Sequence, residues 1–252
     1  MTTLSIVLIV KDESENIIPC LESASFADEI VVVDAGSRDD TLERAKKYTD
    51  KIFVESEWLG YGIQRQRAQG YATSEWILML DADERITPEL QEVILNVVKE
   101  NDQGSVYDIA RLSHCFGRFI RHSGWYPDYV TRLYPRSKAA YNASTVHEKL
   151  EYPVHQKLKK LSGDLLHYTY RDINHYLVKS ASYAEAWSQQ RYEQGKRATL
   201  LQGGLHAVGC FVRMYILRAG FLDGKQGLLL ALLSGHSTFV KYVDLWVRER
   251  QQ

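Results

Sequence analysis

Short apolar runs recur along the first third of the chain. They span residues 4–10, 29–34, 51–54 and 76–80. Runs of this length are typical of strands buried on both faces, as in a parallel sheet that helices cover. Segments with helical spacing separate them, at about residues 14–25 and 61–72. The alternation predicts βαβ units and a mostly parallel α/β sheet flanked by helices.

Acidic residues follow three of these runs. Asp12 and Glu13 follow the first, Asp34 ends the second, and the last one ends in Asp81, Asp83 and Glu84. Ligands of open α/β sheets bind beyond the carboxyl ends of the strands, so the acids mark one candidate crevice. Carboxylates so close together repel unless a cation shares them, and Mg²⁺ or Mn²⁺ suits such oxygen ligands.

A solvated acidic loop before a helix is the alternative interpretation of residues 81–84. Thr87-Pro88 has the sequence of an N-cap followed by proline at the first helical position. Similarly, Ser37 and Asp40 have the spacing of a capping box for the helix after the second strand. The chain lacks GxGxxG and GxxxxGK[ST], which excludes the dinucleotide fingerprint and the P-loop.

Three stretches carry a resemblance to a known family: SIVLIVKDE, EIVVVDAGSRDDT and WILMLDADE. Together they resemble the nucleotide-sugar-binding half of inverting family 2 glycosyltransferases, strongly over residues 4–100. The stretch 129–134, the Val146-His147-Glu148 motif and the segment 220–246 resemble the lipopolysaccharide inner-core β-1,4-glucosyltransferases of Gram-negative bacteria. The resemblance implies a Rossmann-like GT-A fold, a UDP-glucose-type donor, and Mg²⁺ or Mn²⁺ as cofactor.

The resemblance also implies roles for individual residues. Asp34 would contact the uracil and ribose, with capping of the next helix as the alternative. Asp83 would ligate the metal directly, while Asp81 would ligate it or reach the ribose. A guanidinium suits a diphosphate because it forms bidentate, charge-assisted hydrogen bonds. The nucleotide-sugar-binding set is Lys11, Asp12, Glu13, Asp34, Gln64, Arg65, Asp81 and Arg132.

Inversion at the anomeric carbon requires a general base that deprotonates the acceptor hydroxyl. Glu148 is assigned this role, with His147 orienting it or the acceptor, and an ordinary strand-edge pair is the alternative. Glu84 is the rival base, disfavoured because it adjoins the metal site. Trp125 and Tyr126 lie in a loop punctuated by glycine and proline. They could form a platform on which the acceptor sugar stacks, or equally a core plug beneath the loop.

Charge is unevenly placed along the 252 residues. Residues 1–148 carry a formal net charge of −8 and residues 149–252 carry +7. The sequence pattern of the last third of the chain predicts helices. Aromatic and basic residues accompany their apolar faces, a combination that suits a membrane surface. A helical hairpin packed on the catalytic part is the alternative. The sequence shows no apolar run near the ~20 residues of a membrane span, and residues 1–10 lack the features of a signal peptide.

These patterns predict a catalytic domain at 1–170, with a nucleotide-sugar half (1–100) and an acceptor half (101–170). Residues 171–252 would form a helical, membrane-associating region. Three widely spaced cysteines without a CxxC motif argue against disulfides and against a zinc site.

The expected function is transfer of a hexose, glucose by the resemblance, from a UDP-sugar to a heptose of the lipopolysaccharide core. It would occur at the cytoplasmic face of the inner membrane. A polyprenyl phosphate, a capsule chain or a protein could instead be the acceptor. A non-catalytic membrane-docking protein with a degenerate transferase domain is the alternative from another class. No nucleic-acid motif accompanies the basic residues.

Overall fold

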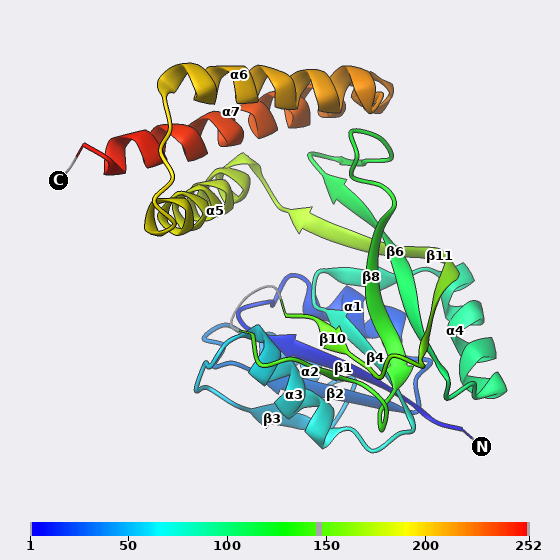
Figure 1. The fold of residues 1–252 in the computed structure, drawn as a ribbon. Coiled ribbons are helices and arrows are strands. Elements are labelled where there is room, and N and C mark those ends of the chain that lie inside the picture. The colour runs from blue at the N-terminus through cyan, green and yellow to red at the C-terminus, as the bar shows by residue number, and fades with distance from the viewer. Residues whose placement is uncertain (1, 145–147, 251–252) are drawn as a thin grey trace. The chain divides into compact units, whose positions relative to one another are not determined.

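The computed structural model describes residues 2–144 and 148–250. Its sheet contains four parallel strands in the order β3-β2-β1-β4 (Figure 1). Their bounds are β1 (Leu4–Val10), β2 (Glu29–Asp34), β3 (Ile52–Val54) and β4 (Trp76–Asp81). The chain leaves β1 toward β2 on one side and returns to β4 on the other, so a topological switch point lies between β1 and β4. The parallel sheet that the apolar runs predict is confirmed.

The sheet continues beyond β4 in the order β4-β8-β6-β11-β5. Strand β8 runs antiparallel to β4 and to β6, and β5 runs antiparallel to β11. These strands are β5 (Glu84–Ile86), β6 (Ser105–Cys115), β8 (Asp128–Pro135) and β11 (Lys157–Tyr170), with β7 (Arg118–Phe119) paired to β6. Two short strands, β9 (Ala140–Tyr141) and β10 (Leu150–Glu151), form a separate pair. The mixed sheet therefore brings sequence-distant segments beside the end of β4.

Alternate residues of the central strands enter two different apolar cores. Ile6 and Leu8 of β1 belong to one cluster, which includes residues of α1 and α4, whereas Val7 belongs to another, which includes Ala68 of α3. The helices of this part are α1 (Ile17–Ala24), α2 (Thr41–Ala45), α3 (Tyr61–Tyr71) and α4 (Pro88–Glu100). Burial on both faces explains why these strands lack polar alternation.

The two predicted helix starts have different outcomes. The hydroxyl of Thr87 accepts a hydrogen bond from the Leu90 amide at 3.3 Å, with Pro88 as the first residue of α4, so this N-cap is confirmed. The capping box at Ser37 is wrong. Helix α2 begins at Thr41, and within the described chain its N-cap Asp40 makes no side-chain capping bond. Ser37 instead donates to Asp34 and accepts from the Asp12 amide.

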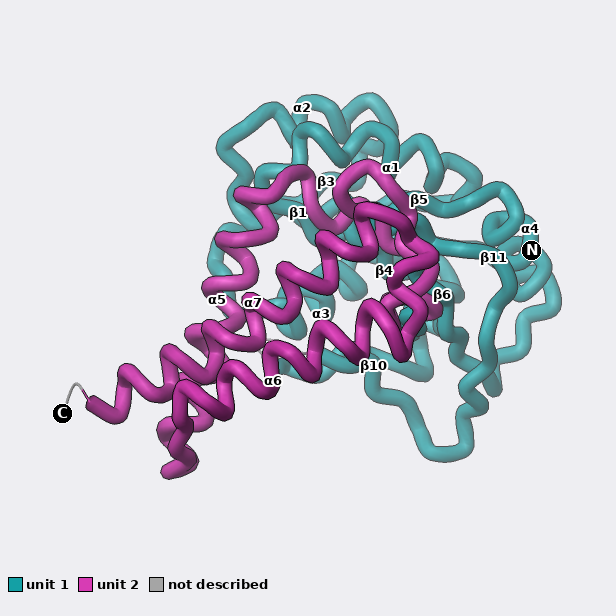
Figure 2. The backbone as a smooth tube through the Cα atoms, turned by 90° about the horizontal axis from the view of Figure 1, so that it is seen from above, with its two compact units in different colours: residues 1–111, 128–167 teal, residues 112–127, 168–252 magenta. Residues whose placement is uncertain are grey.

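The chain divides into two compact units (Figure 2). Unit 1 contains residues 1–111 and 128–167, and unit 2 contains residues 112–127 and 168–252. Unit 2 contains the expected C-terminal helices: α5 (Ile173–Glu193), α6 (Leu200–Val212), the π-helical turn η1 (Arg213–Leu217), the 3-10 turn η2 (Gly220–Asp223) and α7 (Gly224–Arg248). Ala219 adopts a left-handed conformation (φ 52°), which separates η1 from η2. The domain boundary at residue 170 stays a prediction.

Glycines allow α6 and α7 to approach closely. A Cβ atom at Gly203 would lie 3.1 Å from Cβ of Tyr242, and one at Gly235 would lie 3.1 Å from the carbonyl oxygen of Ala207. Each glycine therefore faces the opposite helix of the pair. Among the described residues, one helix is long and apolar enough to cross a membrane by length and composition: Leu200–Leu217, with a mean hydropathy of 1.3.

Gly163 of β11 allows this strand to contact α4. Its φ is +86°, and a Cβ atom there would lie 2.7 Å from the backbone nitrogen of Leu90. Gly36 has a similar φ of +89°, but its Cβ would make an ordinary 3.5 Å contact with Ser56. We expect Gly36→Ala to cost about 1–2 kcal/mol through backbone conformation alone, and Gly163→Ala at least about 1 kcal/mol more through overpacking. Urea unfolding of both variants, which lie in unit 1, measures the difference; equal costs would contradict the proposed close approach.

Candidate active site

The loops that follow β1 and β2 are joined by hydrogen bonds. The Asp12 amide donates to the Ser37 hydroxyl at 2.9 Å, and the Arg38 amide donates to the Asp12 carboxylate at 2.7 Å. The Glu13 amide donates to the Thr41 hydroxyl at 2.8 Å. Strand register places Val10 beside Asp34, so these loops leave the same edge of the sheet. The residues expected to line a base pocket after β1 and β2 therefore come together.

Asp34 shapes the turn that follows its own strand. Its side chain is buried and accepts hydrogen bonds from the amides of Gly36 and Ser37, each at 2.9 Å. Gly36 has a φ of +89°, which suits glycine. The Ser37 amide also contacts the other carboxylate oxygen at 3.2 Å, and the Ser37 hydroxyl donates to that oxygen, so the turn supplies about as many hydrogen bonds as a carboxylate accepts. The nucleotide-binding role of Asp34 stays a prediction.

A network of buried charges lies at the carboxyl end of β4. Arg65 of α3 donates to Asp81 at 2.8 Å and to Glu148 at 2.9 Å. Arg132 of β8 donates to Asp81 as well, and to Glu84 at 3.1 Å. The Glu84 carboxylate also accepts the Asp81 amide at 2.9 Å. Two guanidinium groups and three carboxylates from four separate segments therefore form one cluster.

The two arginine side chains are almost fully buried, 5% and 6% exposed. Burial opposes the charge on Arg65, but the Asp81 carboxylate raises the pKa of this guanidinium above its usual value. Burial also acts to raise the pKa of Asp81, yet Arg132 and Arg65 outweigh it and hold that pKa well below its usual range. Asp81 is therefore ionised at neutral pH.

Each arginine keeps one buried nitrogen without a hydrogen-bond partner in the described part of the chain. These atoms are Nη1 of Arg65 and Nε of Arg132. A buried N–H group that lacks a partner costs about 1–3 kcal/mol. Guanidinium donors with unused capacity can bind an additional anion, and their planar arrangement suits phosphate oxygens.

Glu148, the predicted base, is 83 residues from Arg65 in sequence yet bonds to it directly. Its side chain is 16% exposed, so it is reachable from solvent while its Oε1 atom contacts Arg65. By contrast, Glu84 is fully buried and paired, which removes it from contact with an acceptor. The other predicted catalytic residue, His147, lies outside the described residues.

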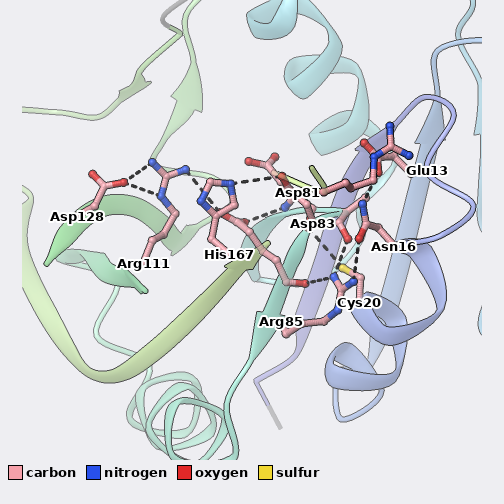
Figure 3. A network of polar contacts seen from close by, with 12 residues as sticks. Glu13, Asn16, Cys20, Asp81, Asp83, Arg85, Arg111, Asp128 and His167 are labelled. Carbon is pink, nitrogen blue, oxygen red and sulfur yellow. Dashed lines mark hydrogen bonds and ion pairs between the residues drawn. The ribbon is translucent and has the colours of Figure 1, made fainter. Parts of the chain in front are cut away.

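Asp83 lies beside a histidine that sequence reasoning missed. Nε2 of His167 is 3.3 Å from the Asp83 carboxylate (Figure 3). The pairing of β11 with β5 produces this contact, because His167 stands opposite Glu84 in the register. Both side chains are partly exposed, at 16% and 27%. A lone histidine in residues 157–170 carries no motif, so sequence offered no signal for it.

Asp83 and His167 form a donor pair that fits a divalent cation. No group of three or more possible ligands occurs among the described residues, but Mg²⁺ often binds one or two protein groups together with substrate phosphates. Carboxylate suits both Mg²⁺ and Mn²⁺, and imidazole binds transition metals such as iron, nickel and zinc. Asp81 faces two guanidinium groups in this structure; its assignment as a metal ligand stays a prediction.

Further contacts fix the turn that carries Asp83. Arg85 donates to the carbonyl oxygens of Ala82 and Glu84, both at 2.7 Å, and contacts Asn16 of the loop before α1 (Figure 3). The Cys20 thiol lies 3.5 Å from the Asp81 carbonyl oxygen. These contacts anchor the turn that carries the partly exposed Asp83 carboxylate, as a binding site requires.

Three other predicted residues have different surroundings. Gln64 is buried and donates to the Glu55 carbonyl oxygen at 3.1 Å, which connects α3 to the segment after β3. Trp125 and Tyr126 belong to unit 2. There Trp125 packs against an apolar cluster and the Tyr170 ring, whereas the Arg121 guanidinium lies 5.6 Å from the centre of the Tyr126 ring. Their acceptor role stays a prediction.

Comparison with known proteins identifies the family. Residues 5–153 match the model of Glycosyl transferase family 2. The chain belongs to this family. This glycosyltransferase is 27% identical over 256 residues to the lipopolysaccharide core biosynthesis glycosyltransferase LpsC of Rhizobium meliloti (strain 1021), covering 95% of this chain and 93% of LpsC. It is also 27% identical to an uncharacterized glycosyltransferase of Rickettsia prowazekii (strain Madrid E), covering 97% and 87% of the two chains.

A solved structure supports the fold. The crystal structure of S. aureus TarS 1–349 in complex with UDP has a TM-score of 0.51 and 16% sequence identity, and the match covers 99% of this chain and 92% of that one. The mixed, mostly parallel sheet flanked by helices is the GT-A fold, as predicted, with helices at the C-terminal end.

The buried network yields a stability prediction for Arg132. Arg132→Met should cost about 3–5 kcal/mol, because it leaves the buried Glu84 and the partly buried Asp81 with one cation fewer. Arg44→Met is the control: Arg44 and its partner Asp40 are 39% and 46% exposed, so the loss of this pair should cost less than about 1 kcal/mol. Urea unfolding at neutral pH measures both.

The cost of Arg132→Met should also depend on pH. The lowered pKa of Asp81 contributes stability above the ordinary aspartate pKa of about 3.9, and this contribution is lost as the pH falls below it. The difference between the parent chain and the variant should therefore shrink between about pH 5 and pH 2. A difference that stays constant over this range would contradict the role of Arg132 in ionising Asp81.

Proposed function

We propose that this family 2 enzyme transfers a hexose, glucose in the first instance, from a UDP-sugar to a heptose of the lipopolysaccharide inner core. The observation that carries the proposal is the cluster in which Arg65 joins Asp81 to Glu148. In this cluster Arg65 contacts both the strand end that would hold the donor and the carboxylate that would act as the base. The full-length similarity to LpsC supports a lipopolysaccharide core acceptor.

The proposed reaction inverts the anomeric carbon in one displacement. The acceptor hydroxyl oxygen attacks C1 of the donor hexose as its proton passes to the Glu148 carboxylate. The bond between C1 and the β-phosphate oxygen breaks, and its electron pair leaves with UDP. A carboxylate within hydrogen-bond reach of the hydroxyl suffices as the base. Lys11, Asp12, Glu13 and Asp34 would hold the uridine in this reaction.

Arg65 and Arg132 would bind the diphosphate. Their unpartnered buried nitrogens, Nη1 and Nε, are available donors within the described chain. A diphosphate carries more negative charge than a single carboxylate, so it would compete with Asp81 and Glu148 for Arg65. Donor binding would then weaken the ion pair between Arg65 and Glu148, which frees Glu148 to accept a proton. Fixed cationic donors also stabilise the charge that develops on UDP.

Asp83 and His167 would hold a divalent cation against the diphosphate. When bound, such a cation supplies Lewis-acid stabilisation of the leaving group. The TarS structure with the same fold is a complex with UDP, and another TarS structure is a complex with UDP-GlcNAc. These neighbours support a UDP-linked donor, while the glucose assignment rests on the sequence resemblance. The proposed place of action is the cytoplasmic face of the inner membrane.

Calorimetric titration tests the donor site first. We expect UDP and UDP-glucose to bind in the presence of Mg²⁺ or Mn²⁺, more tightly than UDP-galactose or GDP-mannose, and to bind weakly in EDTA. Asp83→Asn and His167→Ala should each weaken metal-dependent UDP binding by about 10-fold or more. Absence of nucleotide binding under every condition would overturn the proposal. Equal UDP affinity with the metal ion and with EDTA would instead show that donor binding does not require a metal.

Glu148→Gln tests the assignment of the base. The variant should keep UDP-glucose affinity within about threefold, because the amide oxygen can still accept from Arg65. Its turnover should fall by about 10²-fold or more, because an amide cannot accept the acceptor proton. Glu151→Gln, at an exposed position of β10, is the matched control and should retain turnover. Near-normal turnover of Glu148→Gln would show that another residue acts as the base.

A further inference from the structure

Helix α6 exposes an apolar face that lacks charged residues. Leu201, Leu205 and Val208 share one side of the helix, spaced i, i+4 and i+7, and are 62–73% exposed. Only 11% of the residues in the segment Leu200–Leu217 are buried. Arg213 is the one charged residue of this segment. The opposite side of α6 packs against α7, because Gly203 and Ala207 face that helix. A surface helix of a globular protein normally carries charged or polar residues on its solvent-facing side.

The same apolar character continues through the turn between α6 and α7. Leu217, Phe221 and Leu222 are 51–73% exposed. Basic residues accompany them: Arg213, Arg218 and Lys225 are all exposed. From residue 194 to residue 243 the one acidic residue is Asp223. Its side chain is buried and accepts hydrogen bonds from the amides of Arg121 and His122. The exposed charge of this turn is therefore cationic.

We propose that α6 and the following turn, residues 200–225, bind in the plane of an anionic lipid surface. Leu201, Leu205 and Val208 would enter the boundary between headgroups and acyl chains, while Arg213 and Lys225 contact lipid phosphates. This combination of an uncharged apolar face and flanking basic residues is typical of interfacial helices. The inference deepens the proposed location of the enzyme, but it needs neither donor nor acceptor and can be tested apart from sugar transfer.

An in-plane arrangement fits these residues better than a membrane span. The segment Leu200–Leu217 includes Arg213, and a charged side chain within the hydrocarbon region of a bilayer is costly. Moreover, one side of α6 packs against α7, whose Lys225, Lys241, Asp244 and Arg248 would have to enter the membrane with it.

Lipid also fits better than a second copy of the chain. The two copies would bring like charges together at the turn, since its exposed charges are Arg213, Arg218 and Lys225. Juxtaposed like charges oppose association. An anionic surface instead complements them, and each basic residue near it strengthens binding by about fivefold.

Vesicle co-sedimentation of the whole chain provides the test. Phosphatidylcholine vesicles with phosphatidylglycerol should bind the protein, more tightly than phosphatidylcholine alone, and added salt should weaken this preference. The double variant Leu205→Glu/Val208→Glu should lose at least about tenfold in affinity. Leu95→Glu, at an exposed leucine of α4 in unit 1, is the matched control and should bind normally.

A second variant separates the proposal from misfolding of α6. Arg213→Gln/Lys225→Gln changes two exposed residues and should reduce binding to anionic vesicles alone, by about 25-fold. Circular dichroism and UDP affinity establish that each variant is folded. The proposal is overturned if the parent chain does not bind vesicles, or if both double variants bind as it does. Retention in the vesicles after an alkaline carbonate wash would also overturn it, in favour of a spanning helix.

Discussion

Two buried guanidinium groups constrain the arrangement of unit 1. Arg65 and Arg132 can remain charged in the interior only because Asp81, Glu84 and Glu148 surround them. Loss of one partner from such a buried group leaves an uncompensated charge and destabilises the fold strongly. Helix α3, strands β4, β5 and β8, and the segment before β10 must therefore meet at one place. That place is the carboxyl end of β4, beside the topological switch point of the sheet.

The same charges connect fold stability to the proposed chemistry. Carboxylates neutralise the arginines, and two N–H groups lack partners within the described residues. In the proposed reaction a diphosphate uses those groups and draws Arg65 from Glu148. The base would thus become available as the donor arrives, which favours donor binding before the acceptor. Glu84 takes no part in this exchange, because it is fully buried and also holds the Asp81 amide.

The sequence predicted the parallel half of the sheet because both faces of β1, β2 and β4 are buried, which leaves continuous apolar runs. The half of the sheet beyond β4 was not foreseen, since β11 contains Lys159, Lys160 and Gly163 and depends on pairing with distant strands. The acids at strand ends and Glu148 were predicted from motifs, and the structure brings Asp81, Glu84 and Glu148 into one network. His167 was not predicted, because its proximity to Asp83 arises from the register between β11 and β5 rather than from local sequence.

The uneven charge of the chain acquires a physical meaning when it is assigned to the two units. Unit 1 carries a formal charge of −8 and unit 2 carries +7. An anionic lipid surface attracts unit 2 and repels unit 1, so electrostatics alone would favour binding through the helices. The exposed leucines of α6 would then add short-range apolar binding that salt does not screen. Because the two contributions respond differently to salt, a residual affinity at high ionic strength should come from α6, and its loss in Leu205→Glu/Val208→Glu would separate insertion from charge attraction.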